Sequence, residues 1–180
     1  MTAMTREEKE TYLADLHVGV LAINEPGLGP LTVPIWYDYS PGGRLWMITG
    51  TESRKGKLLK AGDRVSLAVQ SENPPYKYVS VEGPITDIKN SSQEELLSMA
   101  SRYLGQEQGQ AYAKANASVS EGHSILVSVT PERWLAVDYS KGQPSIILDN
   151  AQRVLDGIKP DYLQKLFHHD AARLCQINEL

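Results

Sequence analysis

The sequence predicts a mainly β fold, a closed or partly closed β-barrel decorated with helices. Strand-like segments recur at regular spacing between Gly/Pro turns such as Asn24–Pro30 and Ser40–Gly43. Val79 and Val81 alternate with polar neighbours, which is typical of a strand with one face on a core. Strands and helices do not alternate along the chain, and no G-x-G-x-x-G follows the first strand, so a parallel Rossmann sheet is not predicted.

The first expected element is a helix over Thr5–Leu16, in which Thr5 caps the N-terminus and Glu8 occupies the third helical position. Its expected buried stripe consists of Tyr12, Leu13 and Leu16. Apolar and β-branched segments then predict an antiparallel meander of three strands, His17–Ile23, Leu31–Tyr39 and Arg44–Thr49.

A second helix is expected over Ser53–Ala61, with Gly62 in the position of a C-cap glycine. The remaining elements are two strands, a long amphipathic helix and a sixth strand, at Arg64–Gln70, Tyr76–Ile88, Ser92–Ala117 and Ser124–Tyr139. Gly83-Pro84 indicates a bulge or bend in the long fifth strand. The sixth strand is expected to be interrupted near Pro131.

The last part of the chain, Ile146–Leu180, reads as two short helical pieces broken at Gly157 and Pro160. We therefore expect a barrel domain over residues 1–145 and a C-terminal helical extension over residues 146–180 that packs on it.

Composition narrows the class of protein. The chain has 180 residues, 41% of them hydrophobic, which suits one globular domain with a full core. A formal net charge of -4 argues against broad nucleic-acid binding. With Cys175 as its single cysteine the chain forms no internal disulfide, and a cytoplasmic, reducing compartment is expected. We expect neither a signal peptide nor a membrane span, because the N-terminus is polar and no apolar run is long enough.

The strongest local signal for function is the turn that follows the third strand. Four hydroxyl or cationic residues gather there, at the expected N-terminus of a helix: Thr51, Ser53, Arg54 and Lys55. Backbone N–H groups at such a terminus have no partner in the helix, and the helix dipole adds partial positive charge. The turn therefore suits a phosphate group. A solvated basic turn capped by Ser53 is the alternative interpretation.

Motifs for other chemistries are missing. The chain has no H-E-x-x-H, no C-x-x-C, no G-x-S-x-G and no Walker A ending. His168 and His169 read as surface residues, Cys175 as a structural thiol, and His17 and His123 as weak candidates for a proton donor. A phosphate-binding turn without an obvious nucleophile or base favours an enzyme whose cofactor carries the chemistry.

Three motifs occur in a fixed order: Ser53-Arg54-Lys55, then Arg64-Val65-Ser66-Leu67, then Tyr78-Val79-Ser80-Val81-Glu82-Gly83. From about Leu16 to Ile88 their order and spacing resemble the pyridoxamine 5'-phosphate oxidase-like split-barrel flavoproteins. The resemblance implies a six-stranded antiparallel split barrel of the FMN-binding type. It also implies a homodimer with two FMN or deazaflavin (coenzyme F-420) sites at the subunit interface.

The resemblance assigns a group of residues to the cofactor phosphate. Arg54 and Lys55 would bind the phosphate with help from Ser53, and Thr49 would lie beside it. Lys57 would add positive charge for the longer acidic tail of a deazaflavin, or would be an ordinary solvated helix residue.

A second group would surround the ring. Backbone groups of one strand would lie along the isoalloxazine edge, namely those of Val33, Pro34, Ile35 and Trp36. Tyr78 stands where oxidases of the family often carry a Gln that reaches the cofactor from the partner subunit. Trp134 falls where the family often places an aromatic residue near the ring of the other chain. Packing in the core or the dimer is the alternative role of Trp36 and Trp134.

These expectations lead to an FMN- or deazaflavin-dependent oxidoreductase that transfers a hydride to or from a small organic substrate. The Arg- and His-bearing C-terminal segment of true pyridoxamine phosphate oxidases has no match in the last residues, 173–180, so vitamin B6 oxidation is not predicted. The alternative is a flavin- or haem-binding carrier or sensor on the same barrel, without turnover. A haem-degrading relative is a third hypothesis, and it would need a histidine placed to bind iron.

Overall fold

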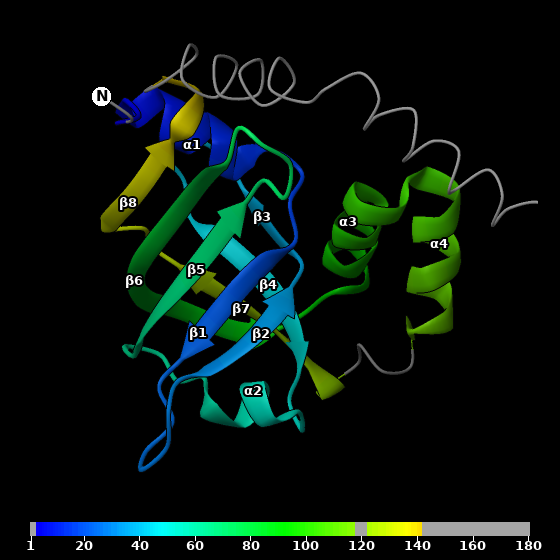
Figure 1. Ribbon diagram of the computed structural model, residues 1–180. Coiled ribbons are helices and arrows are strands. Elements are labelled where there is room, and N and C mark those ends of the chain that lie inside the picture. Colours follow the sequence, from blue (N-terminus) through cyan, green and yellow to red (C-terminus); the bar gives the residue numbers. More distant parts are fainter. Residues whose placement is uncertain (1–2, 118–121, 142–180) are drawn as a thin grey trace, which may run out of the picture. The chain divides into compact units, whose positions relative to one another are not determined.

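The computed structural model describes residues 3–117 and 122–141 (Figure 1). Contacts divide the chain into two units, Met1–Ser140 and Lys141–Leu180. The predicted helical extension over residues 146–180, with its two histidines and Cys175, lies outside the described residues.

An antiparallel sheet of eight strands forms the first unit, in the order β2-β1-β5-β6-β7-β4-β3, with β8 paired to β6. The strands are β1 Gly19–Ile23, β2 Leu31–Ile35, β3 Tyr37–Tyr39, β4 Leu45–Gly50, β5 Arg64–Gln70, β6 Lys77–Asn90, β7 Ser124–Val129 and β8 Arg133–Asp138. The helices are α1 Arg6–Ala14, α2 Arg54–Leu58, α3 Gln93–Leu104 and α4 Gln106–Ala115, and a single 3-10 turn, η1 Tyr139–Lys141, follows β8. The mainly β fold with helices is as predicted.

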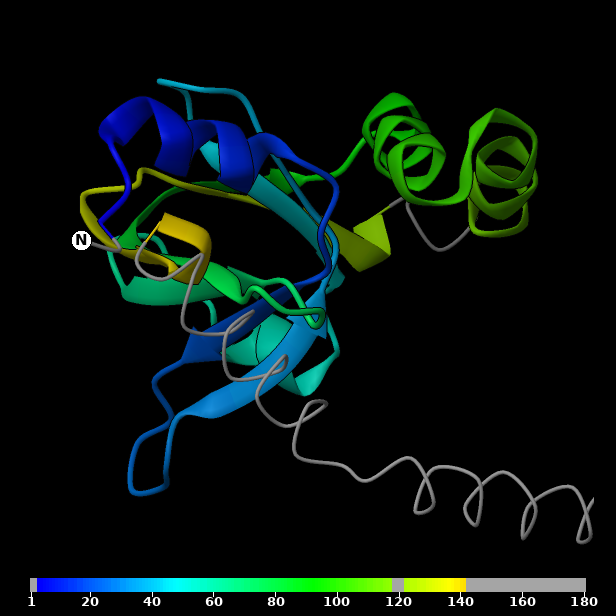
Figure 2. The same ribbon diagram turned by 45° about the horizontal axis from the view of Figure 1, so that its top comes forward.

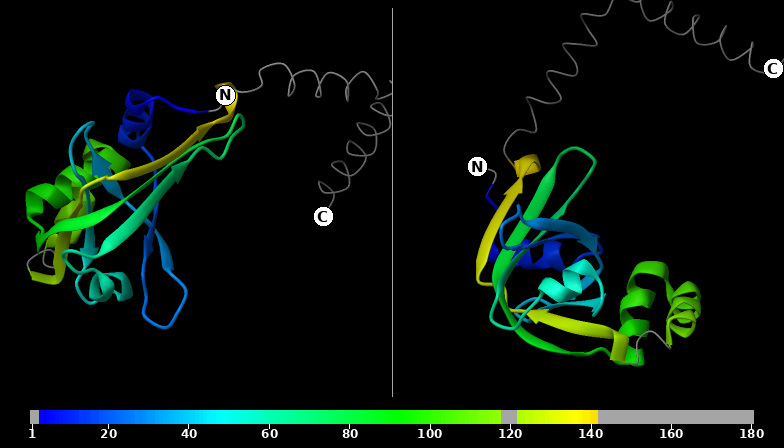
Figure 3. Two further views of the ribbon diagram at one scale, coloured as in Figure 1. Left: turned by 90° about the vertical axis from the view of Figure 1, so that its left-hand side faces the viewer. Right: turned by 90° about the horizontal axis from the view of Figure 1, so that it is seen from below.

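The sheet curls because β6 belongs to both of its halves (Figure 3). The first part of β6 pairs with β5 and β8, and its last part, from Ile85 on, pairs with β7 with a register shift between Ile85 and Asp87. Gly83 marks the point of close approach, where an added Cβ would collide with the carbonyl oxygen of Thr130. The bend predicted at Gly83-Pro84 therefore has a steric cause, the passage of the β7–β8 connection over the strand.

Eight strands replace the six expected because two of the predicted strands are divided. The interruption of the last strand near Pro131 is confirmed and separates β7 from β8. The predicted strand Leu31–Tyr39 was expected to be continuous, but it breaks at Trp36. Its two pieces pair in different places, β2 with β1 and β3 with β4.

Three helix boundaries differ from the predicted ones for identifiable reasons. The helix expected over Ser53–Ala61 ends at Leu58, because Leu59 takes an extended conformation and enters the core. The helix expected over Ser92–Ala117 breaks into α3 and α4 at Gly105, which has a φ of 79°. In the first helix the Thr5–Glu8 capping box is confirmed, whereas Leu16 lies beyond the helix end and is 54% exposed instead of buried.

The core fills the space inside the curled sheet. Its fully buried side chains alternate along the strands and include Leu21, Tyr37, Met47, Leu67, Val79 and Val127. The helix α1 lies at one end of the sheet and α2 at the other, and α3 and α4 stand beside it as a pair (Figures 1 and 2). Leu13 of α1 is fully buried, and the Tyr37 hydroxyl donates to its carbonyl oxygen at 2.7 Å. In residues 3–117 and 122–141, no helix is long and apolar enough to cross a membrane.

Candidate functional site

Ser53 organises the turn between β4 and α2. Its hydroxyl donates to the Gly50 carbonyl oxygen at 2.7 Å and accepts from the Gly56 N–H at 3.0 Å, which makes it the N-cap of the five-residue helix. The hydroxyl of the buried Thr49 lies 3.2 Å from the Ser53 hydroxyl oxygen. The predicted residues Thr49 and Ser53 are thus brought together at the end of β4.

The turn is tight, and it leaves donors free. A Cβ on Gly56 would collide with the Gly50 carbonyl oxygen, so only glycine allows the helix to begin so close to the strand. Among the described residues, the backbone N–H groups of Arg54 and Lys55 have no hydrogen-bond partner, as expected in a first helical turn. Two adjacent N–H groups beside a capping hydroxyl fit the oxygens of a phosphate.

The cationic side chains of the turn differ in their partners. Arg54 donates two hydrogen bonds to Glu25 of the β1–β2 loop, at 3.2 and 2.6 Å, and this pairing raises the pKa of Arg54. Lys57 forms an ion pair with Glu52 at 3.0 Å on the exposed surface. Within the described part of the chain, Lys55 makes no ion pair. An anion arriving here would find Lys55 available, and it would compete with Glu25 for Arg54.

A small pocket opens next to this turn, and we call it the Trp36 pocket. Its volume is about 170 Å³, and it is lined by Trp36, Ile48, Thr49, Gly50, Leu96, Met99, Tyr112, Asn116 and Ser124. Two predicted site residues, Thr49 and Trp36, therefore share one cavity. Leu96 and Met99 of α3 and Tyr112 of α4 also line it, and the sequence prediction did not include these helices in the site.

Tyr103 of α3 fixes the position of Trp36. Its hydroxyl accepts from the Tyr37 N–H at 3.0 Å and lies 2.7 Å and 2.9 Å from the carbonyl oxygens of His17 and Tyr37. Its ring stacks on the Trp36 indole with a centroid distance of 4.9 Å and an interplanar angle of 6°. Burial raises the pKa of Tyr103, so the phenol stays neutral and can donate. These contacts explain why the predicted strand breaks at Trp36.

The predicted ring-binding strand lies at an edge of the sheet. Among the strands of the described residues β2 pairs with β1 alone, so its outer backbone groups have no strand partner there, which suits the predicted role of Val33–Trp36. Ile35 points into the core, whereas Pro34 lies on the exposed face. Pro lacks an N–H and is commonly found on edge strands.

Tyr78 and Trp134 lie apart from the turn in the same chain. Tyr78 of β6 pairs in register with Gln70 and Val137, and it is half-buried. Trp134 of β8 packs against the core, with its ring 6.1 Å from that of Tyr39. Neither residue lines the Trp36 pocket. Their expected approach to a cofactor of the partner subunit stays a prediction.

Sequence reasoning missed the residues of the helical wall. Tyr103, Tyr112 and Asn116 carry no motif, and the long helix was expected to continue through Gly105. The turn that brings α4 back along α3 depends on that glycine and on Gly109, where an added Cβ would lie 2.6 Å from the Ser101 Cα. The amphipathic pattern of this segment was the one signal in the sequence that the helix has a buried face.

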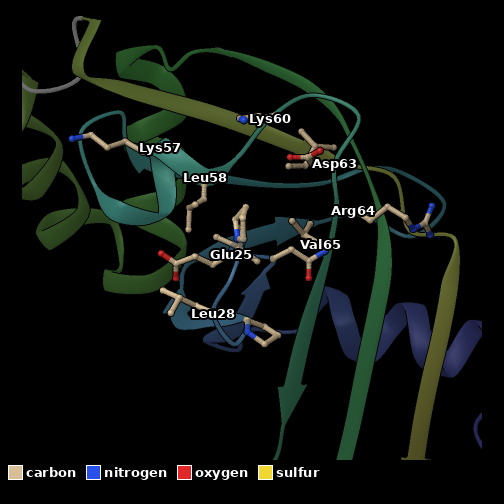
Figure 4. A pocket seen from close by; sticks show the side chains of 13 residues that line it. Glu25, Leu28, Lys57, Leu58, Lys60, Asp63, Arg64 and Val65 are labelled. Carbon is tan, nitrogen blue, oxygen red and sulfur yellow. The ribbon is translucent and has the colours of Figure 1, made fainter.

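A larger cavity of about 650 Å³ lies between the β1–β2 loop, α2 and the start of β5 (Figure 4). Three of the charged residues that line it have partners elsewhere: Glu25 pairs with Arg54, Lys57 with Glu52, and Arg64 with Glu82 and Glu132. Figure 4 shows the Lys57 and Arg64 side chains extending away from the middle of the group. We therefore assign the site to the smaller Trp36 pocket, where the expected residues meet. In the described residues no cluster of three or more His, Cys, Asp or Glu side chains could hold a metal.

Comparison with known proteins supports the architecture. A family model described as pyridoxamine 5'-phosphate oxidase matches residues 5–138. No curated protein matches the chain by sequence.

Solved structures with the same fold include three informative ones. A conserved hypothetical protein from Mycobacterium tuberculosis has 22% identity and a TM-score of 0.62, covering 78% of this chain and 88% of its own. An F420 reductase has 22% identity and a TM-score of 0.56, and the match covers 70% of this chain and 94% of the reductase. An FAD and heme binding protein from Mycobacterium smegmatis has 15% identity and a TM-score of 0.58, and the match covers 76% of this chain and 72% of that protein. These likenesses show the shared split-barrel fold.

Proposed function

The chain belongs to the pyridoxamine 5'-phosphate oxidase family, and from this membership we propose that it is a flavin-dependent oxidoreductase. It binds FMN or a deazaflavin and transfers a hydride between the cofactor and a small organic substrate. One observation carries the proposal: the donors at Ser53, Arg54 and Lys55 lie beside a pocket that contains Thr49 and Trp36.

The residues of the turn supply the affinity for the cofactor. Ser53 and the free N–H groups of Arg54 and Lys55 contact the phosphate, and the Lys55 ammonium group neutralises it. Each charge-assisted hydrogen bond contributes roughly 1.5–3 kcal/mol. The exposed backbone edge of β2 lies along the ring, and the fixed indole of Trp36 limits its position. When bound, the cofactor supplies the two-electron chemistry, and the chain orients it and excludes water.

We propose a homodimer that uses the outer face of the sheet. In register across five strands, this face carries an uncharged row of side chains, Pro34, Val20, Ala68, Ser80 and Leu135. Leu135 is 61% exposed and Val20 46% exposed. An uncharged, partly apolar row that crosses neighbouring strands is typical of an interface between subunits. Tyr78 lies on the same face, two residues from Ser80, and this position supports the proposed approach to a partner subunit.

A deazaflavin is the alternative cofactor, and one observation favours it. Lys57 and Lys60 follow the turn, and both line the cavity of about 650 Å³. A deazaflavin extends beyond its phosphate in an acidic tail, for which these lysines provide positive charge. FMN ends at the phosphate and needs neither lysine.

A carrier or sensor without turnover is the second candidate function. Tyr112 is the one titratable residue among the described residues that line the Trp36 pocket, so no strong acid or base is placed there. Haem binding has less support, since neither His17 nor His123, the histidines of the described part, lines the pocket.

The two functions separate in one experiment. The purified protein is loaded with FMN or deazaflavin, reduced without oxygen, and mixed with a panel of small organic acceptors. The oxidoreductase reoxidises with at least one acceptor faster than the free cofactor does. A carrier reoxidises with none of them faster. A preparation that binds neither cofactor overturns both functions.

A further inference from the structure

The Trp36 pocket has a rigid aromatic side. The Trp36 indole stacks on Tyr103 and makes a tilted contact with Tyr112, with a centroid distance of 5.6 Å and an angle of 52°. The Tyr103 hydroxyl is held by the backbone of Tyr37 and His17, so the wall is ordered before any ligand binds. Leu96 and Met99 of α3 and Ile48 of β4 complete an apolar lining. Such a surface matches a flat ring better than a flexible polar chain.

The pocket also lacks charge. None of the residues that line it within the described part of the chain is Lys, Arg, Asp, Glu or His. The cationic side chains of the neighbouring turn are absent from its walls, and Arg54 and Lys57 are held by Glu25 and Glu52. An anionic ligand would therefore lose its hydration without gaining a counter-charge.

The remaining polar groups in the pocket are neutral. The hydroxyls of Thr49 and Ser124 are already bonded, to Ser53 at 3.2 Å and to Ser91 at 2.6 Å. Tyr112 of α4 and Asn116, the residue that caps the C-terminus of α4, lie one turn apart, and the Asn116 amide nitrogen donates to the Tyr112 carbonyl oxygen at 2.9 Å. The Tyr112 hydroxyl and the Asn116 amide oxygen have no partner among the described residues, and so are left for a ligand.

We propose that the Trp36 pocket binds a neutral, flat aromatic molecule that carries a hydroxyl or carbonyl group, oriented by Tyr112 and Asn116. The further claim that this molecule is the substrate of the enzyme rests on the proposed function, whereas the claim that the pocket binds it does not. The volume of about 170 Å³ is below the roughly 300 Å³ at which pockets for drug-sized ligands begin, so the ligand is of the size of one or two fused rings.

Two matched probes test the charge preference, 2-naphthol and 2-naphthalenesulfonate, which share a ring system and differ in charge. Calorimetric titration of the full chain should show naphthol binding at least about tenfold more tightly than the sulfonate. Leu96→Lys places a cation in the pocket and should bring the two affinities together or reverse them. The control Leu97→Lys makes the same change at the next position of α3, outside this pocket.

The Tyr112 and Asn116 variants test orientation. Tyr112→Phe and Asn116→Ala should each weaken naphthol binding several-fold. Equal binding of the two probes, or the same shift in preference from Leu97→Lys as from Leu96→Lys, overturns the proposal.

A titration with both ligands separates this inference from the proposed function. Naphthol that binds equally well with FMN present supports a substrate site beside the cofactor. Naphthol that FMN displaces assigns the pocket to the cofactor ring and overturns the substrate role. If FMN does not bind while naphthol binds as expected, the proposed function fails and the pocket assignment stands.

Discussion

At the scale of single residues, the contact between Arg54 and Glu25 decides how the turn meets an anion. Glu25 holds the guanidinium through two hydrogen bonds in the described structure. A phosphate must share this arginine or displace the carboxylate, whereas the backbone donors and Lys55 are available at once. The affinity of the site for a phosphate therefore depends on the competition between the phosphate and Glu25 for Arg54.

Removing the Arg54 side chain should measure its contribution to the affinity for FMN. We expect Arg54→Ala to weaken FMN binding by at least about tenfold, the equivalent of one charge-assisted hydrogen bond. Glu25→Gln should strengthen binding, because it removes the competing carboxylate. Arg6→Ala removes an arginine paired with Glu10 on α1 and serves as the control. Flavin fluorescence titration gives the three affinities, and an unchanged value for Arg54→Ala would remove Arg54 from the site.

His17 gives the stability of the chain a pH dependence. Burial lowers the pKa of His17, an effect that the nearby Asp15 opposes and Arg102 reinforces. The folded state therefore binds the proton less readily than the unfolded chain, whose histidine has a pKa of about 6.5. Stability is complete above this value and falls as the pH drops below it.

We expect the free energy of unfolding to decrease between pH 7.5 and pH 5.5, and His17→Gln to flatten that decrease. Urea unfolding at a series of pH values measures both. A slope that His17→Gln leaves unchanged would assign the pH dependence to other groups.

At the scale of elements, the α3–α4 pair is held to the sheet by few contacts, and Tyr103 provides the most specific ones. The hydroxyl replaces strand partners where β2 gives way to β3, and the ring supports Trp36. Arg102 adds hydrogen bonds from the same helix to the carbonyl oxygens of Ala14 and Asp15, at 2.7 and 3.0 Å. The wall of the pocket therefore depends on the end of α3.

Tyr103→Phe should destabilise the chain by about 1–3 kcal/mol, because it leaves the part-buried Tyr37 N–H without its acceptor. Tyr112→Phe is the matched control, since the Tyr112 hydroxyl has no partner among the described residues and its side chain is 40% exposed. Tyr112→Phe should change the free energy of unfolding by no more than about 0.5 kcal/mol. Urea unfolding measures both values, and equal costs would contradict the role given to Tyr103.

Most elements could be predicted because their signals are local. The capping box of α1, the alternation in β5 and β6 and the interruption at Pro131 each lie within a few residues of the element they define. The break at Trp36 could not be predicted, because a residue of α3 causes it. The early end of α2 likewise depends on the burial of Leu59 in a distant core. Gly105 was a local signal that the amphipathic pattern concealed.

The same division applies to the site. Ser53, Arg54 and Lys55 are consecutive, so the sequence alone could place them at one turn. Thr49 and Trp36 are separated along the chain and were placed together only through a family resemblance. Tyr112 and Asn116 required the fold of α4 against α3, which no motif in the sequence encodes.

At the scale of the whole molecule, the uncharged row on the sheet predicts association. We expect the protein to be a dimer, and Leu135→Glu to shift it to the monomer, because a charge at this exposed position of the row would lose its hydration in the interface. The control is Leu28→Glu, which changes a leucine of similar exposure, 65%, in the β1–β2 loop. Light scattering gives the mass of each, and a monomeric parent would contradict the proposed dimer.

The central claim is that an anionic group of a planar redox cofactor binds at Ser53–Lys55, and FMN and riboflavin test it most directly because they differ only in the phosphate. Titration of the protein with each should show FMN binding at least about a hundredfold more tightly, the effect of two or more charge-assisted hydrogen bonds. Lys55→Ala should narrow that difference. Equal affinities for FMN and riboflavin would contradict the account.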